Sequence, residues 1–382
     1  MSAPAAVPTP SYLESLEQIV VDIVEPQAVA VDQSGVFPRA ALDALGAARL
    51  LGLISAVEVG GLGQGHRATT RVIERLAEAP VLLALPPGIR HHPGAAVIEA
   101  YGPRDVRTAV AAGRHLTTLA FSEAGSRSHF WAPVSSATAM NGHVQLDAQK
   151  SWATAAGQVD SYVWSSRPLA AEGASTIWLV PGATNGLRVT APFNGLGLRG
   201  NHSSPVSASA VELPMTAMLG CDGGGFEIMM GVVLPYFQLM NAAASVGTMA
   251  AATAKAAAHV GGTGLQHLGQ TLSDLPTIRA YLARMQIKTD MARTLLLATV
   301  TALEEGRPDA MLRVLEVKAA AGEAATEVTD LAMRVCGGAA FRKEVGVERH
   351  FRDARAATVM APTTDVLYDF IGKAVCGMPL FG

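Results

Sequence analysis

The sequence predicts an α+β protein in which two helical regions enclose a β-region. Apolar residues recur at helical spacing up to about residue 115, short β-rich runs replace them at 116–220, and helical spacing returns over 221–382. Helices packed against a compact antiparallel β-domain, with a four-helix-type bundle at the end, would bury the apolar faces of both kinds of element. We therefore expect three domains, at 1–115, 116–220 and 221–382.

The composition allows a large core and argues against several classes of protein. Of the 382 residues, 49% are hydrophobic and 16% charged, so folding requires neither a metal nor a disulfide. The three cysteines lack the spacing of a zinc site and favour a reducing cytoplasm. A net charge of −3 with mixed signs provides no basic surface for nucleic acid. We expect neither a signal peptide at the N-terminus nor a membrane span at 226–246, where polar residues and a proline interrupt the apolar run.

The first region is expected to be all-helical. Apolar residues at helical spacing predict a core-facing helix from Tyr12 to Val31, with further helices over 40–52 and 69–79. Gly60–Gly65 (GGLGQG) and Pro86-Pro87-Gly88 are expected to break the helical pattern. GGLGQG follows no predicted strand, so it is interpreted as a turn and not as a dinucleotide-binding loop.

Short β-rich runs separated by turn residues define the second region. Asn141-Gly142 and Asn185-Gly186 have the composition of hairpin turns. The predicted strands are Leu116–Ser122, His143–Leu146, Ser161–Ser165, Thr176–Val180 and Val206–Val211.

Helical spacing in the third region predicts long, closely packed helices. A stripe of apolar residues from Leu282 to Leu303 stops before Gly306 and Pro308, as at the end of a helix. A second, alanine-rich helix is expected from about Asp309 to Val335.

Several motifs resemble those of the acyl-CoA dehydrogenase superfamily and together extend over nearly the whole chain. LAFSEAGSRSHF (119–130) is similar to the flavin-contacting segment of that family, and KSWATAAGQVDSYV (150–163) to the segment that forms one wall of its flavin pocket. The other matching segments are FPRAALDALGAARLLGLISAVEVGGLG (37–63), GLGLRGNHSSPV (195–206), GGGFEIMM (223–230) and VCGGAAFRKEVGVERHFRDAR (335–355).

This resemblance implies an FAD cofactor between the β-domain and the bundle. Backbone groups near Phe121 and the hydroxyl of Ser122 would bond the pyrimidine edge of the flavin. Ser128 would lie by the pyrophosphate of FAD or CoA, Trp152 against the dimethylbenzene side, and Thr154 within reach of N5. Hydroxyls and a flat aromatic suit a flavin, because its reduced form needs hydrogen-bond donors and its faces need apolar cover.

The resemblance also places further cofactor contacts in the last region, at Gly337, Gly338, Thr363 and Asp365. The family arginine that reaches the FAD pyrophosphate of a neighbouring subunit is replaced here by Leu265. Arg334 stands where a cofactor-contacting glutamine is usual, and we hypothesise that it restores the lost positive charge. The implied assembly is a homotetramer or dimer.

The usual catalytic base is missing from this pattern. In the family a glutamate removes the α-proton of an acyl thioester, but MAPTTD (360–365) has Ala361 at that place. The alternative location of the base falls near Pro235–Gln238, which contains no acid. Asp365, Asp369 and His92 are the remaining candidates.

Three functions stay open from the sequence. The first is oxidation at Cα–Cβ of an acyl thioester, carried by CoA or a carrier protein, with electrons passed to an electron-transfer partner. The second is oxygenation, because residues 352–377 are also similar in rhythm to flavin monooxygenases of the dibenzothiophene and 4-hydroxyphenylacetate hydroxylase group, where His91 and His92 would match a functional histidine. A structural role for this histidine pair is equally open. The third is a degenerate, non-catalytic flavoprotein.

Overall fold

The computed structural model describes residues 11–79 and 85–380. For Ser11 and for residues 85–89 it describes the backbone alone. The N-terminal region is helical. Helix α1 (Ser11–Ile19) continues through a π-helical turn, η1 (Val20–Val24), into α2 (Glu25–Ser34), so the helix predicted from Tyr12 to Val31 is confirmed. The region continues with α3 (Arg39–Ala47), η2 (Val57–Val59), α4 (His66–Glu78), α5 (Leu85–Tyr101) and α6 (Arg104–Ala111).

The two breaks predicted in this region have different outcomes. The GGLGQG segment is a turn between η2 and α4, with Gly60 and Gly63 at φ +91° and +58°. The break predicted at Pro86-Pro87-Gly88 is wrong, because these residues lie in the first turn of α5. Proline is tolerated there since the first N–H groups of a helix have no partner within it.

Two sheets form the middle region of the described chain. One has the strand order β1 (Thr117–Ala120), β4 (Ser161–Ser166), β5 (Thr176–Pro181), β8 (Met218–Leu219), and the short helix η4 (Met215–Ala217) precedes its last strand. The other has the order β2 (Ser136–Met140), β3 (His143–Ala153), β7 (Ser204–Pro214), β6 (Leu187–Val189). Neighbouring strands are antiparallel except β1 and β4, which run parallel, so the prediction of an antiparallel β-domain is wrong at this pair. The chain between them is long enough for the crossover that a parallel pair requires.

The two Asn-Gly turns also differ in outcome. Asn141-Gly142, at φ +28° and +85°, joins β2 to β3 as the predicted hairpin. Asn185-Gly186 joins β5 to β6, which belong to different sheets, so the hairpin predicted there is wrong. Local sequence specifies a tight turn at both places but not which strands the turn connects.

Long helices form the last region. Helices α7 (Gly225–Ile228), η5 (Met229–Val233) and α8 (Leu234–Gly262) make one continuous rod, followed by the small β9 (Gly264–Leu265) and β10 (Gln270–Thr271) pair and η6 (Leu272–Asp274). Helix α9 (Pro276–Glu304) buries Met285, Ala292 and Leu296 as its stripe predicted, and α10 (Ala310–Cys336) follows. The chain ends with η7 (Gly337–Phe341), α11 (Val347–Val359) and α12 (Thr364–Val375).

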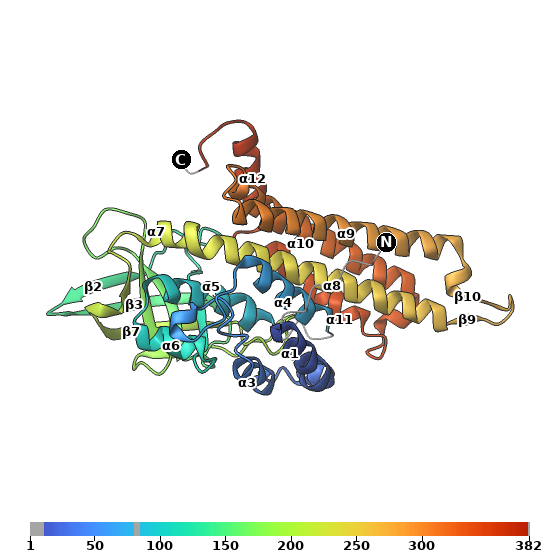
Figure 1. Cartoon of the computed structure of the whole chain (residues 1–382), viewed down its shortest axis with the longest axis horizontal. Coiled ribbons are helices and arrows are strands. Elements are labelled where there is room, and N and C mark those ends of the chain that lie inside the picture. The colour runs from blue at the N-terminus through green and yellow to red at the C-terminus, as the bar shows by residue number, and fades with distance from the viewer. Residues whose placement is uncertain (1–10, 80–84, 381–382) are drawn as a thin grey trace, which may run out of the picture.

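The rod formed by α7, η5 and α8 is the core helix of the bundle. Its length and composition would allow it to cross a membrane, but 78% of its most apolar window is buried inside the protein. In Figure 1 it runs beside α9 and α10, with α4 against it; β2, β3 and β7 lie at one end of the molecule, and β9 and β10 at the other. The expected domain bounds at 115/116 and 220/221 fall in the loops ahead of β1 and α7.

A buried ion pair holds the loop after β1 against β3. Lys150 on β3 is 1% exposed, and its Nζ lies 2.5 Å from Oε1 of Glu123 and 2.7 Å from the carbonyl oxygen of Ser165. Burial alone would raise the pKa of Glu123, but the Lys150 ammonium and hydrogen bonds from Ser135 and Val134 lower it overall. The carboxylate therefore stays charged and fixes the loop at 122–128.

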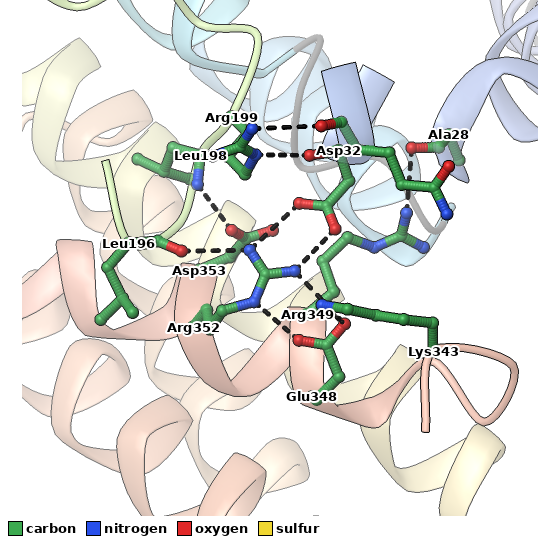
Figure 2. Close-up of polar contacts among 11 residues, drawn as sticks. Ala28, Asp32, Leu196, Leu198, Arg199, Lys343, Glu348, Arg349, Arg352 and Asp353 are labelled. Carbon is green, nitrogen blue, oxygen red and sulfur yellow. Dashed lines mark hydrogen bonds and ion pairs between the residues drawn. The ribbon is translucent and has the colours of Figure 1, made fainter. Parts of the chain in front are cut away.

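A second polar cluster joins the three regions, and we call it the Arg352 cluster (Figure 2). The guanidinium of Arg352 on α11 lies 2.6 Å from Oδ2 of Asp32 on α2 and 2.7 Å from Oε2 of Glu348. It also donates to the carbonyl oxygen of Leu196 at 3.0 Å. One side chain thereby connects the N-terminal helices, the turn after β6 and the bundle, in the planar geometry that suits arginine and carboxylates.

Asp353, the next residue, belongs to the same cluster. Its Oδ1 accepts the N–H of Leu198 at 2.6 Å, while its Oδ2 is buried without a hydrogen-bond partner among the described residues. Burial raises the pKa of Asp353 to about 6, and the bond from Leu198 only partly opposes this.

We expect Lys150→Met to lower the free energy of unfolding by about 3–5 kcal/mol, because Glu123 would stay buried without its counter-charge. The double variant Lys150→Met with Glu123→Gln should recover most of that loss. Urea denaturation at fixed protein concentration measures both. A single variant as stable as the parent protein would contradict this role for the pair.

Stability should also depend on pH through Asp353. Its carboxyl binds a proton more tightly in the folded chain than in the unfolded chain, where its pKa is about 4. Its contribution is therefore full below pH 4 and is lost as pH rises through about 6. Asp353→Asn, which keeps the acceptor for Leu198, should gain up to about 3 kcal/mol relative to the parent protein between pH 4 and 7. A stability difference independent of pH over this interval would refute the assignment.

Candidate functional site

A cavity of about 790 Å³ lies where the β-region meets the bundle. This volume falls in the range of small-molecule sites. Its walls come from the loop after β1, the end of β3, the turn between β6 and β7, and α11 with the segment that follows it. The residues that line it include Ser122, Glu123, Arg127, Ser128, Ser151, Trp152, Thr154, Phe193, Leu196, Leu198, Asn201, Ser203, Arg352, Arg355, Met360, Ala361 and Thr363, with Arg90 from α5.

Hydroxyl groups line the β-side of the cavity. Thr154 Oγ1 and Ser203 Oγ lie 3.0 Å apart in a hydrogen bond, and Ser128 Oγ accepts the N–H of Thr363 at 2.9 Å. Ser151 Oγ is buried and has no hydrogen-bond partner in the described part of the chain. This wall can therefore donate hydrogen bonds to a polar ligand edge.

Trp152 is a large apolar side chain on the same wall. It is 58% exposed, whereas Trp164 and Trp178 in the neighbouring sheet are fully buried. Strand β3 alternates its side chains between the two faces of its sheet, and Trp152 stands on the face that borders the cavity. An exposed indole beside a cavity is suited to cover a flat ring.

The charged residues of the lining are mostly cationic. Glu123 is the acidic side chain among them, and Lys150 neutralises it. Arg352 is held by Asp32 and Glu348, but Arg90, Arg127 and Arg355 form no ion pair with any described residue. The cavity therefore favours ligands that carry negative charge.

The structure brings together Ser122, Ser128, Trp152, Thr154 and Thr363 from the predicted cofactor contacts. Phe121 does not line the cavity, because its ring is 5% exposed and packs in the core near Phe130. The backbone of the same segment reaches the cavity through Ser122.

The candidate bases do not reach the cavity. Asp365 and Asp369 are exposed on α12 outside its lining, and Asp369 forms an ion pair with Lys373 at 2.8 Å. Ala361 lines the cavity with a methyl group, which cannot accept a proton. At the alternative location, the amide of Gln238 is buried with neither Oε1 nor Nε2 bonded among the described residues.

The adjacent histidines attach α5 to the loop before η2. His91 Nε2 lies 2.9 Å from the carbonyl oxygen of Leu51, and its Nδ1 accepts the N–H of Thr117 at 3.2 Å. Burial lowers the pKa of His91 to about 3, so the ring is neutral. His92 Nε2 lies 3.2 Å from the carbonyl oxygen of Leu50, and its side chain does not line the cavity. Both rings therefore have a structural role, since each bonds α5 to the loop at residues 50–51.

Arg334, Gly337 and Gly338 lie away from the cavity, at the end of α10. Arg334 is exposed, with its guanidinium 5.0 Å from the ring centroid of Tyr281 and 3.2 Å from the hydroxyl of that residue. The two glycines are also exposed. None of these three residues lines the cavity of its own chain.

Arg90, Arg355, Asn201 and Ser203 are among the cavity residues that were not predicted from the sequence. Arg355 and the Asn201–Ser203 stretch lie inside segments 335–355 and 195–206, which resemble family motifs, so their motif position was an available signal. Arg90 had none, because it precedes a histidine pair in a segment without other charge. Only the packing of α5 against the bundle places its side chain in the cavity.

Comparison with known families identifies both helical regions. Residues 11–112 match the acyl-CoA dehydrogenase N-terminal domain, and residues 223–376 match the acyl-CoA dehydrogenase C-terminal domain. The probable acyl-CoA dehydrogenase YngJ of Bacillus subtilis (strain 168) is 25% identical over 350 residues, which cover 90% of this chain and 91% of that protein. The short-chain specific mitochondrial acyl-CoA dehydrogenase of Homo sapiens is 27% identical over 372 residues, covering 94% and 89%.

Solved structures share the fold. Butyryl-CoA dehydrogenase from Megasphaera elsdenii superposes with a TM-score of 0.89 at 21% identity, over 98% of this chain and all of that one. The FAD complex of PigA superposes with a TM-score of 0.87 at 16% identity, over 98% and 99%. The chain therefore belongs to the acyl-CoA dehydrogenase family, a family of oxidoreductases that act on CH–CH bonds.

Proposed function

We propose that this protein is an FAD-dependent oxidoreductase that oxidises the Cα–Cβ bond of an acyl thioester, carried by CoA or a carrier protein. The observation that supports it best is the wall formed by exposed Trp152 beside the hydroxyls of Ser122 and Thr154. This wall borders a cavity of about 790 Å³ in a chain of the acyl-CoA dehydrogenase family.

The residues present fit a flavin. Trp152 offers a flat apolar surface for a ring, and the hydroxyls of Ser122 and Thr154 offer hydrogen bonds to a polar ring edge. The unpaired guanidinium groups of Arg127 and Arg355 can bind phosphates. A bound flavin would supply a hydride acceptor for Cβ of the acyl chain.

The residues of the chain would position the substrate and exclude water. Met360 and Ala361 give the cavity an apolar wall opposite the hydroxyls, where an acyl chain can lie. The Arg352 cluster keeps α11 and the turn at 195–201 in place, so the two walls keep their spacing. Proton removal from Cα has no carboxylate among the lining residues except Glu123, which Lys150 neutralises.

Oxygenation is the second candidate, and Ala361 is the observation that favours it. A cavity without a free carboxylate cannot use the usual proton abstraction, whereas oxygenation does not require it. A non-catalytic flavoprotein is the third candidate. In each case the flavin wall described above would be retained.

We also propose that the active form is a homotetramer or dimer in the cytoplasm. Arg334, Gly337 and Gly338 are exposed and lie away from the cavity of their own chain, so they are free to contact FAD bound by a neighbouring subunit. Reduced FAD would pass its electrons to an electron-transfer partner, or to oxygen in the second candidate.

Anaerobic mixing of the FAD-loaded protein with saturated acyl-CoA thioesters tests the proposed function. We expect the flavin absorbance to bleach, because oxidation at Cα–Cβ transfers a hydride to the ring. Bound flavin that no acyl thioester bleaches, but that consumes oxygen once reduced chemically and hydroxylates a substrate, would favour the second candidate. Protein that retains no flavin would exclude both enzymatic functions.

Ala361→Glu tests whether the missing base limits the rate. A carboxylate at this place should accelerate bleaching by about 10²- to 10⁴-fold, the range of general base catalysis. Ala361→Gln is the matched control, because it has nearly the same shape and cannot take up the proton. Equal bleaching rates in the two variants would show that proton removal occurs elsewhere.

A further inference from the structure

Arg90 is a cation in the cavity without an acidic partner. It is half-buried on α5, and its guanidinium carbon lies 4.3 Å from the ring centroid of Phe237 on α8. Within residues 11–79 and 85–380 it forms neither an ion pair nor a hydrogen bond. Residues 1–10, 80–84 and 381–382 contain no aspartate or glutamate.

A second buried cation lies close to it. Lys318 on α10 is 1% exposed, and its Nζ donates to the carbonyl oxygens of Met360 at 2.9 Å and Pro362 at 2.7 Å. Burial and, to a smaller extent, the charge of Arg90 lower the pKa of Lys318 to about 7. Lys318 thus lies within electrostatic range of Arg90 and is bonded on either side of Ala361, which lines the same cavity as Arg90.

This arrangement is electrostatically unfavourable without a ligand. Cations removed from water are normally paired with an anion, and an unpaired one is costly. Carbonyl dipoles partly solvate Lys318, whereas the Arg90 guanidinium lies over the face of Phe237 among the described residues. A guanidinium has the geometry to bind a carboxylate through two hydrogen bonds.

Arg90 comes from a different part of the fold than Arg127 and Arg355, the two arginines proposed to bind phosphates. Arg127 lies on the loop after β1 and Arg355 on α11, beside the hydroxyl wall, whereas Arg90 comes from α5 and packs against α8. The charge of Arg90 acts on Lys318, which bonds the carbonyl oxygens on either side of Ala361. By the family resemblance, the reacting acyl carbons would lie beside Ala361. An anion bound by Arg90 would thus belong to the acyl chain.

We propose that Arg90 binds a carboxylate on the acyl group, so that the substrate is the monothioester of a dicarboxylic acid. This inference rests on the proposed function, since it names the substrate class of the same cavity. The pocket would select such a substrate over a neutral acyl chain because only the carboxylate neutralises Arg90.

Binding, measured apart from turnover, tests the inference. Glutaryl-CoA and pentanoyl-CoA have five-carbon acyl groups that differ in the terminal carboxylate, so the ratio of their dissociation constants isolates its effect. We expect FAD-loaded protein to bind glutaryl-CoA at least about tenfold more tightly, by calorimetry or flavin spectral perturbation. Arg90→Gln should reduce that ratio by about 10- to 100-fold, and Arg90→Lys should retain part of it.

Arg71→Gln is the control, because it removes an exposed arginine of α4 outside the cavity lining and should leave the ratio unchanged. Equal affinities of the parent protein for the two thioesters, or a ratio unaffected by Arg90→Gln, would overturn the inference while leaving the proposed function intact. If neither thioester binds or bleaches the flavin, both the inference and the proposed function fail. If Arg90→Gln loses FAD or melts at a lower temperature than the parent protein, Arg90→Lys takes its place in the comparison.

Discussion

The bidentate contact of Arg352 with Asp32 and Glu348 is the interaction on which the site depends. The guanidinium connects α2, the turn before β7 and α11, which belong to three regions of the sequence. Its carboxylate partners are largely buried and fork-shaped, so the contact has one preferred geometry. The turn at 195–201 and helix α11 form two walls of the cavity, and this contact sets the distance between them.

The loop after β1 forms a third wall, and a buried ion pair holds it in place. Glu123 and Lys150 are both buried, and each satisfies the charge of the other. The acidic side chain of the cavity lining is therefore neutralised within the protein. Three arginines of the lining have no acidic partner in the described part of the chain. Negative charge must then come from the ligands, which fits a cofactor with a pyrophosphate and a substrate with anionic groups.

The proposed absence of a catalytic carboxylate at Ala361 can be considered together with the cations Arg90 and Lys318. A glutamate at that place would lie near two cations, and its pKa would be lowered by them. Such a glutamate would be a weaker base, so a cationic pocket makes a carboxylate at this place less effective in proton removal. The fold that bounds the cavity is retained, since superposition with butyryl-CoA dehydrogenase covers nearly the entire chain.

The sequence by itself determined the order of helical and β-regions and the long helices, because local interactions encode periodicity. Its family resemblance also implied that Ser122, Trp152 and Thr154 belong to one site, and the three residues do line one cavity. Tertiary structure alone decided that β1 pairs parallel with β4, that Asn185-Gly186 connects two sheets, and that His91 and His92 bond the loop at 50–51. It also decided that Arg90 shares a cavity with Ala361, 271 positions later in the chain. Such pairings depend on which surfaces pack together, and neither spacing nor residue type at one position carries that information.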